Sequence, residues 1–330
     1  MNHLLPKVSI LIPCYNSEQW LAQAIESALN QTYQNKEVIV VDDGSSDNSL
    51  DIIKSFGDQI GWETGLNRGG NPTRNRLLQL SSGDWLQYLD ADDYLLPDKL
   101  EKQIQFLNSH PQADVICSPI ILEYYEQDRI FRNTSGKSPK NFDVDVNFDP
   151  WLFLAQWRLP QTAGSLWNKK SLVEIGGWKE DLLSCQEYEL YLRALMAGHK
   201  FEYYGEALSV YRQWSDKTVC KKNPAGTYKN RLKILDTLEL YLTSSGQLTD
   251  FRKNAINQSR FDCARIIWLF DHQWALDIIQ QIGKSHSQFV PSSHKVPYFY
   301  RLIYKSLGFN AAEIAAKFKR ELLNRPLINT

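Results

Sequence analysis

The sequence predicts an α/β fold, a mostly parallel sheet with helices on both faces, followed by a helical C-terminal region. In the N-terminal part, apolar runs rich in β-branched residues alternate with segments of helical periodicity. Long connections separate successive strands, as parallel pairing requires. From residue 217 onward the pattern is helical. We therefore expect an α/β domain over residues 1–216 and a helical region over residues 217–330.

The first elements follow from local patterns. VSILIP (8–13) is an apolar run that ends at a proline and a polar turn, which is typical of a buried strand. Residues 17–30 place apolar side chains on one helical face, with Ser17 as the expected N-cap. EVIVVDDGSSD (37–47) and GDWLQYLDADD (83–93) are two further strands that end in acidic residues.

Polar side chains follow three of these strands. They are Cys-Tyr-Asn at 14–16, Asp42-Asp43, and the aspartates from Asp90 to Asp93. In open parallel sheets, ligands bind beyond the carboxyl ends of the strands, so these residues indicate a site. Asp90 and Asp92 alternate along an extended chain and point to the same side, as two ligands of Mg²⁺ or Mn²⁺ would. A solvated turn is the alternative interpretation.

An EF-hand is excluded at this position. Asp90, Asp92 and Glu101 have the spacing of loop positions 1, 3 and 12, but Leu95 occupies the place of the required glycine. A magnesium or manganese ion that shares its coordination with a diphosphate needs only one or two protein carboxylates.

Composition describes an ordinary globular protein. The chain has 330 residues, of which 43% are hydrophobic and 23% charged. No apolar run reaches the ~20 residues of a membrane span, and the first residues do not resemble a signal peptide. Five scattered cysteines predict a reducing compartment, so we expect a cytoplasmic protein.

Charge is distributed unevenly. Residues 1–216 hold 19 Lys and Arg against 30 Asp and Glu, whereas residues 217–330 hold 18 against 8. The acidic part suits a cation site, and the basic part suits anionic lipid or a phosphate-bearing acceptor. Mutual attraction of the two parts is the alternative.

The end of the basic region is amphipathic. Residues 298–323 combine aromatic and basic side chains, and Asn310 is placed to cap a helix. One face of that helix would carry Ala311, Ile314, Ala315, Phe318 and Leu322. This pattern predicts peripheral contact at the inner face of an anionic membrane, or docking of the face on the protein's own core.

Several separated motifs occur in a fixed order along residues 6–214. They are VSILIPCYN, ESALNQTYQNKEVIVVDDGSSDNS, Arg74-Asn75, GDWLQYLDADDYLLPDKL, GSLWNKKSLVEIGGW, QEYELYLRALMAG and ALSVYRQW. Together they resemble the family 2 glycosyltransferases of GT-A fold, which have a Rossmann-like sheet. The resemblance implies a nucleotide-sugar-binding part over residues 1–93 and an acceptor part over residues 94–216.

The resemblance also implies roles for individual residues. The nucleotide-sugar site would include Pro13, Tyr15, Asp43, Arg74 and Asp90. Tyr15 matches a position near the base, Asp43 one that hydrogen-bonds the base, and Arg74 one near the diphosphate. Asp92, together with Asp90, matches the ligands of the Mn²⁺ or Mg²⁺ ion.

Inverting transfer needs a carboxylate to take the proton of the attacking hydroxyl. In the family this base usually belongs to a Glu-Asp pair six residues before an arginine. Arg193 therefore places Glu187 in the base position and Gln186 before it, and both residues depart from the commoner ones. The alternative is that Glu187 and Glu189 form a solvated helix face. Trp214 stands where relatives often carry histidine.

The resulting expectation is a metal-dependent inverting glycosyltransferase. The donor would be a nucleotide-diphospho-sugar, UDP being the family's commonest nucleotide. The acceptor hydroxyl would belong to a glycan, a lipid-linked molecule or a protein in surface polysaccharide or glycolipid synthesis, with no nucleic acid involved. A sugar-nucleotide-binding protein without catalysis is one alternative. A sugar nucleotidyltransferase is the other, although CYNSEQW (14–20) lacks the expected glycine-rich loop.

Overall fold

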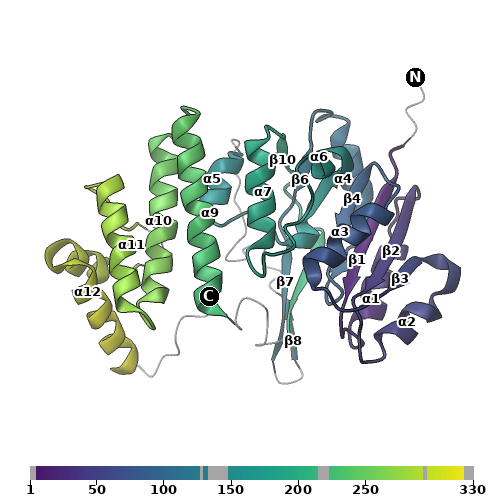
Figure 1. Ribbon diagram of the computed structural model, residues 1–330, viewed down its shortest axis with the longest axis horizontal. Helices are drawn as coiled ribbons and strands as arrows, with labels where there is room; N and C mark the ends of the chain where they lie inside the picture. Colours follow the sequence, from purple (N-terminus) through teal and green to yellow (C-terminus); the bar gives the residue numbers. More distant parts are fainter. Residues whose placement is uncertain (1–4, 127–128, 133–147, 215–222, 293–295, 323–330) are drawn as a thin grey trace. The chain divides into compact units, whose positions relative to one another are not determined.

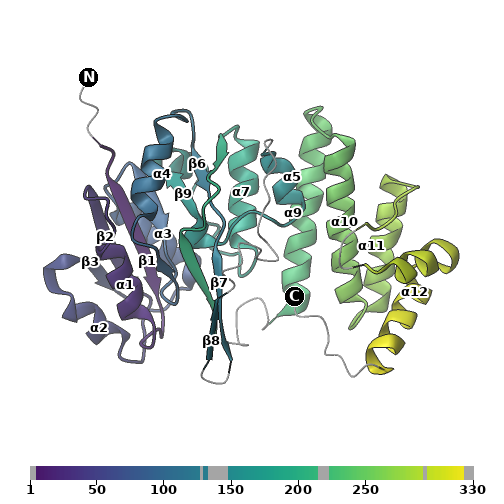
Figure 2. The same ribbon diagram turned by 180° about the vertical axis from the view of Figure 1, so that it is seen from behind.

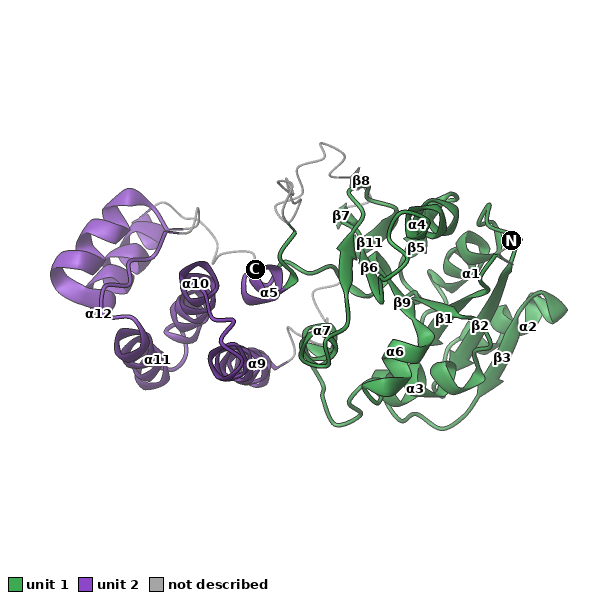
Figure 3. Ribbon diagram, turned by 90° about the horizontal axis from the view of Figure 1, so that it is seen from above, with its two compact units in different colours: residues 1–150, 158–222 green, residues 151–157, 223–330 purple. Residues whose placement is uncertain are grey.

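The computed structural model describes residues 5–126, 129–132, 148–214, 223–292 and 296–322, seen from two sides in Figure 1 and Figure 2. The chain divides into two compact units (Figure 3). Unit 1 comprises Met1–Pro150 and Arg158–Lys222, and unit 2 comprises Trp151–Trp157 and Asn223–Thr330. A short segment in the middle of the predicted acceptor part therefore groups with the C-terminal helices.

Unit 1 is built on a seven-stranded sheet of order β10-β6-β9-β4-β1-β2-β3 (Figure 1). Its strands are β1 (Val8–Cys14), β2 (Lys36–Asp42), β3 (Gly61–Thr64), β4 (Trp85–Tyr88), β6 (Val115–Cys117), β9 (Ser165–Asn168) and β10 (Phe201–Tyr203). β1 pairs in parallel with β2 and β4, and β9 is antiparallel to both of its neighbours. This mostly parallel sheet confirms the predicted α/β class.

Helices cover both faces of the sheet. The first face carries α1 (Leu21–Leu29), α2 (Ser49–Ser55) and α4 (Lys99–Leu107), which share a hydrophobic core with alternate residues of β1 and β2. Figure 3 shows α3 (Gly70–Leu80) and α6 (Lys169–Glu174) on the other face. The remaining helical elements of unit 1 are η1 (Gly57–Gln59), η2 (Thr162–Gly164) and α7 (Gln186–Met196).

The first helix begins later than the sequence predicts. α1 starts at Leu21, and Ser17 does not cap it. The Ser17 hydroxyl donates instead to the carbonyl oxygen of Tyr15, and its main-chain N–H donates to Ser49 Oγ at 2.8 Å. The main-chain N–H of Ser17 thus joins the loop after β1 to the start of α2, while its hydroxyl bonds within the loop.

A second, four-stranded sheet has the order β5-β11-β7-β8 (Figure 3). Its strands are β5 (Tyr94–Leu95), β7 (Ile121–Glu126), β8 (Arg129–Arg132) and β11 (Ser209–Gln213). β11 pairs antiparallel with β5, which directly follows the aspartate cluster. The last strand of the α/β domain, β11, therefore lies beside the strand that follows Asp92.

Unit 2 is helical. It contains α5 (Pro150–Ala155), α9 (Pro224–Ser244), α10 (Asp250–Ile267), α11 (His272–Ser285) and α12 (Tyr298–Leu322). Its core surrounds Phe261 of α10. The centre of this ring lies 5.9 Å from that of Phe289, which follows α11, and 6.2 and 5.8 Å from those of Tyr300 and Phe309 in α12. Among the residues described, no helix is both long and apolar enough to cross a membrane.

Candidate active site

The three polar strand ends lie at one edge of the main sheet. β1 is hydrogen-bonded in parallel to β2 on one side and β4 on the other, so their carboxyl ends are neighbours. Pro13, the penultimate residue of β1, is half-buried opposite Val41 of β2. Tyr15 follows β1 with 52% of its surface exposed, as a residue that stacks on a ligand would be.

The two acidic residues after β2 fix the neighbouring loops. Asp42 accepts hydrogen bonds from the main-chain N–H of Ser45 at 3.2 Å and from Thr64 Oγ1 at 2.7 Å. Asp43 accepts from the N–H groups of Arg68 and Gly69 at 2.7 and 2.8 Å. The Asp43 carboxylate therefore positions the turn that starts α3, the helix that carries Arg74.

Arg74 is hydrogen-bonded to one carboxylate and lies within the electrostatic influence of a second. Its Nη2 donates to Asp90 Oδ1 at 2.7 Å, and its guanidinium lies 5.0 Å from the centre of the buried Trp178 ring. Arg74 is only 9% exposed, and burial acts to lower its pKa. The charges of Asp90 and Glu187, together with the hydrogen bond to Asp90 and the effect of Tyr88, outweigh burial, so the pKa of Arg74 is raised and the group stays cationic.

Asp92 carries an incompletely balanced charge. Burial and the nearby charge of Asp90 raise its pKa, while the hydrogen bond from Trp214 Nε1 to Asp92 Oδ2, at 2.9 Å, acts to lower it. The hydrogen bond from Arg74 uses Oδ1 of Asp90, and the hydrogen bond from Trp214 uses Oδ2 of Asp92. Two neighbouring carboxylates at a ligand-binding edge are the donors that a hard divalent cation takes.

Arg212 of β11 supports this aspartate turn. Its Nη1 donates to the carbonyl oxygen of Asp92 at 2.9 Å, and its main-chain N–H donates to Asp93 Oδ1 at 2.9 Å. Burial and the charges of Asp92 and Asp90 raise the pKa of Asp93 well above its usual range. The Arg212 guanidinium also lies 3.4 Å from Glu123 and over the ring of Trp20. Asp93 is thus a structural residue.

Glu187 is presented in the first turn of α7. The residue before this helix, Cys185, has the left-handed backbone conformation (φ 60°) that is uncommon outside glycine, and such conformations concentrate at functional sites. Glu187 Oε1 accepts a hydrogen bond from Thr162 Oγ1 at 2.7 Å. Since its charge also acts on Arg74, Glu187 belongs to the same constellation as Asp90.

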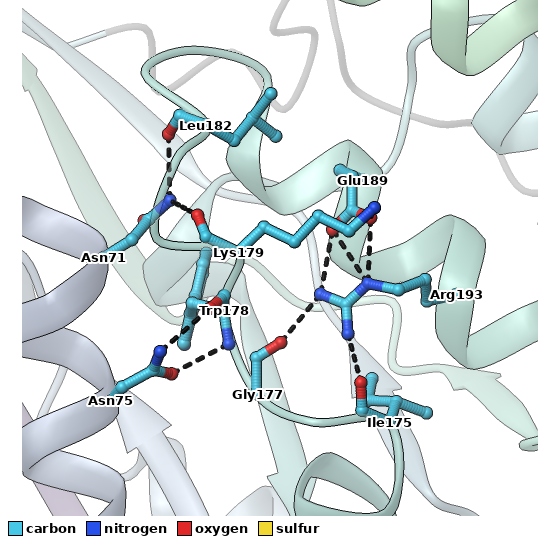
Figure 4. Close-up of polar contacts among 9 residues, drawn as sticks. All are labelled: Asn71, Asn75, Ile175, Gly177, Trp178, Lys179, Leu182, Glu189 and Arg193. Atoms are coloured by element: carbon cyan, nitrogen blue, oxygen red, sulfur yellow. Dashed lines mark hydrogen bonds and ion pairs between the residues drawn. The ribbon is translucent and has the colours of Figure 1, made fainter.

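Figure 4 shows how the segment before α7 is held. On the α3 side, Asn71 Nδ2 donates to the carbonyl oxygens of Lys179 and Leu182, and Asn75 exchanges two hydrogen bonds with the main chain of Trp178. Gly177 has φ 65°, and a Cβ there would lie 2.7 Å from Asn75 Oδ1, so only glycine fits.

On the α7 side, Arg193 anchors the same segment. Its guanidinium donates to the carbonyl oxygens of Ile175 and Gly177 (Figure 4). Glu189 is buried, and its carboxylate forms ion pairs with Arg193 at 2.8 Å and with Lys179 at 2.5 Å. The alternative interpretation of Glu187 and Glu189 as a solvated helix face is therefore wrong for Glu189, whose carboxylate balances these two cations.

The described structure holds no group of three or more His, Cys, Asp or Glu side chains that could enclose a metal ion. The donor set at Asp90 and Asp92 fits a different kind of site, in which two carboxylates share the ion with ligand oxygens. A cation bound there would favour the charged form of Asp92, whose pKa is raised by burial and by the charge of Asp90.

The structure thus brings Arg74, Asp90 and Glu187 together and leaves Tyr15 exposed at the neighbouring strand end. The sequence analysis did not identify Thr162, Arg212 or the supporting role of Asn71 and Asn75. Of these, the asparagines had a sequence signal, since both lie on the helix that carries Arg74.

Comparisons with known proteins relate this chain to glycosyltransferases. Residues 9–157 match the family model described as Glycosyl transferase family 2. An uncharacterized glycosyltransferase of Rickettsia typhi is 33% identical over 196 residues, which is 59% of this chain and 60% of that protein. The chain spans about half the length of the curated relatives it matches.

A relative with an assigned reaction comes from Escherichia coli. It is named UDP-Glc:α-D-GlcNAc-diphosphoundecaprenol β-1,3-glucosyltransferase and is 38% identical over 104 residues, which is 31% of this chain and 41% of that protein.

Two solved structures share the fold. Residues 1–349 of Staphylococcus aureus TarS, in complex with UDP-GlcNAc, give a TM-score of 0.66 at 16% identity and cover 96% of this chain and 92% of that one. The mannosyltransferase PcManGT of Pyrobaculum calidifontis, in complex with GDP-Man and Mn²⁺, gives 0.53 at 15% identity, with coverages of 97% and 81%.

Proposed function

We propose that this chain, which carries a family 2 glycosyltransferase domain over residues 9–157, transfers a sugar from a nucleotide-diphospho-sugar to a hydroxyl group with inversion at the anomeric carbon. The observation that carries the proposal is the ion pair of Arg74 with Asp90 at the ligand-binding edge of the sheet, close enough to Glu187 for that carboxylate to raise the pKa of Arg74. Asp90 lies just after β4. Glu187 lies in the first turn of α7, the helix that follows the segment 175–182.

The donor half of the site would use the strand ends. Tyr15 is exposed to stack on the nucleotide base, and Asp43 fixes the loop beside it. Arg74 supplies a positive charge for the diphosphate. Asp90 and Asp92 would hold Mn²⁺ or Mg²⁺, which in such sites neutralises the charge that develops on the leaving diphosphate.

Glu187 would be the general base. Its Oε1 is oriented by the Thr162 hydroxyl, and none of the described residues donates a hydrogen bond to Oε2, which would accept the proton. In this assignment the attacking hydroxyl passes its proton to Glu187 as the bond to the anomeric carbon forms. The pair Gln186-Glu187 differs from the residues usual in the family. The position of the Glu187 carboxylate is therefore set by the first turn of α7 in this chain.

The comparisons favour a uridine nucleotide and a lipid-linked acceptor. The TarS complex contains UDP-GlcNAc, and the name of the Escherichia coli relative gives UDP-Glc as donor and a sugar on diphosphoundecaprenol as acceptor. We therefore propose a UDP-sugar donor and a hydroxyl acceptor on a lipid-linked glycan, in surface polysaccharide or glycolipid synthesis. The four cysteines that the structure describes are free, as a cytoplasmic location would require.

The test is a panel of nucleotide sugars, each measured for binding and for slow hydrolysis with Mn²⁺ or with a chelator. Hydrolysis needs no acceptor, since water replaces the attacking hydroxyl. We expect metal-dependent binding and hydrolysis of at least one UDP-sugar. Binding without any turnover in the presence of metal would favour the non-catalytic alternative, and formation of a nucleotide sugar from a sugar phosphate would favour the nucleotidyltransferase.

A further inference from the structure

The last helix of unit 2 has two opposite apolar faces. α12 is bent at Gly308, whose φ of 84° is outside the helical range. Its inner face contributes Tyr300, Phe309 and Ala312 to the core around Phe261. Figure 3 shows the helix beside the other helices of the same unit. Its outer face is apolar as well, which an ordinary surface helix is not.

The outer face of the second half forms a continuous stripe. Ile314, Phe318 and Leu322 are four residues apart and are 59%, 63% and 70% exposed. These are residues of the apolar face that the sequence predicts. The alternative that the face docks on the protein's own core is wrong for all three. At 100° per residue, Lys317 and Lys319 lie on either side of the stripe, and both are exposed.

The first half repeats this arrangement. Tyr298, Phe299 and Leu302 are exposed, and Lys305 and Arg301 lie next to them on the helix surface. Together, Tyr298, Phe299, Leu302, Ile314, Phe318 and Leu322 with their basic neighbours are called the α12 outer face below.

The α12 outer face carries a net positive charge. The helix holds five basic residues, Arg301, Lys305, Lys317, Lys319 and Arg320, and two acidic ones. At 100° per residue, Arg320 lies on the side opposite the stripe, so the other four basic residues border the outer face. One of the acids, Glu313, is buried and accepts from Arg265 Nε at 2.7 Å and from the Tyr300 hydroxyl at 2.6 Å. The other acid, Glu321, is exposed, so the four basic residues that border the outer face outnumber the acids that α12 itself exposes.

We infer that the α12 outer face binds the surface of an anionic membrane. Apolar side chains flanked by lysines suit the boundary between acyl chains and headgroups, because the lysine stems extend along apolar surface while the ammonium groups reach the lipid phosphates. A second copy of this chain is a poorer partner, since a symmetric contact would bring the same basic residues of both copies together. Binding of this kind is independent of the proposed catalysis, and would bring the active site to a lipid-linked acceptor if that proposal holds.

The test is sedimentation of the full chain with vesicles of phosphatidylcholine alone or with about 30% phosphatidylglycerol, which supplies the negative surface that basic clusters bind. We expect cosedimentation with the anionic vesicles, weakened by salt. Phe318→Asn should lower the partition coefficient roughly tenfold, the factor for losing one buried aromatic side chain. Its matched control is Phe251→Asn on α10, where the ring is 80% exposed outside the α12 outer face; this change should leave binding unaltered.

Charge is tested in the same way. Lys317→Gln with Lys319→Gln should lower binding roughly fivefold for each lysine, whereas Lys233→Gln, an exposed lysine of α9, should not. Equal binding to neutral and anionic vesicles, or equal effects of Phe318→Asn and Phe251→Asn, would overturn the inference. So would a dimer in sedimentation velocity that Phe318→Asn dissociates, because the occupant would then be a second copy.

Discussion

Replacement of Glu187 by Gln separates the proposed base from the residues that support it. Glutamine keeps the shape of the side chain and an oxygen that accepts from Thr162, but it cannot take a proton. Positioned proton transfer contributes roughly 10²–10⁴-fold, so we expect kcat to fall by about that factor. Donor binding should change little, because the proposed metal ligands lie on a different element. Glu187→Asp should keep part of the activity, since it shortens the carboxylate by one methylene.

Glu189→Gln is the matched control, two residues along the same helix. The sequence analysis predicts a solvated residue that tolerates this change, whereas the structure places a buried carboxylate between Arg193 and Lys179. Loss of its charge weakens hydrogen bonds to cations, each of which contributes about 1.5–3 kcal/mol. We therefore expect the free energy of unfolding to fall by about 2 kcal/mol, with kcat per folded molecule close to that of the wild type.

The assay combines metal-dependent hydrolysis of the UDP-sugar with thermal unfolding of each variant. Near-normal turnover of Glu187→Gln would refute the assignment of the base. A large loss of kcat in Glu189→Gln at unchanged stability would assign the role to Glu189 instead. If both variants turn over normally, the base lies outside α7.

Three further outcomes are expected. Asp92→Asn should abolish turnover and leave the unfolding temperature close to the wild-type value; normal turnover would exclude a metal role for Asp92. Trp214→Phe removes an N–H that lowers the pKa of Asp92, so the midpoint for Mn²⁺-dependent UDP binding, measured by calorimetry, should move to higher pH; an unmoved midpoint would contradict this. Burial lowers the pKa of Lys99 to about 7. Between pH 7 and 10 the unfolded state therefore binds more protons than the folded state. The stability of the wild type relative to Lys99→Met should then rise with pH by roughly 1.4 kcal/mol per pH unit. A difference that does not vary with pH would show that Lys99 is charged when buried.

The fold of unit 1 was predictable because its signals are local. Each strand of the β1, β2 and β4 group is a short apolar run with polar residues directly after it, and parallel pairing places those ends together. The proximity of Arg74 to Asp90, 16 residues apart, follows from the same strand–helix unit. The amino-acid sequence alone is therefore sufficient to select the residues at these strand ends.

The rest of the site depends on contacts that no local pattern encodes. Trp214 reaches Asp92 across 122 residues because β11 pairs with β5 beside the aspartate turn. Glu189 looks like a surface residue in the sequence, and only the folded 175–182 segment brings Lys179 to it. The outer face of α12 was predicted as an apolar face, but whether it is covered depends on packing around Phe261, which the sequence does not specify.

The most direct test of the central claim is the affinity for UDP, measured by calorimetry in Mn²⁺ and again with a chelator. If a cation shared by Asp90, Asp92 and a diphosphate completes the site, removal of the metal should weaken UDP binding by at least about tenfold, the equivalent of 1.4 kcal/mol. Asp92→Asn should bind UDP equally weakly in both conditions. Equal wild-type affinity with Mn²⁺ and with chelator would contradict a metal–diphosphate site at these aspartates.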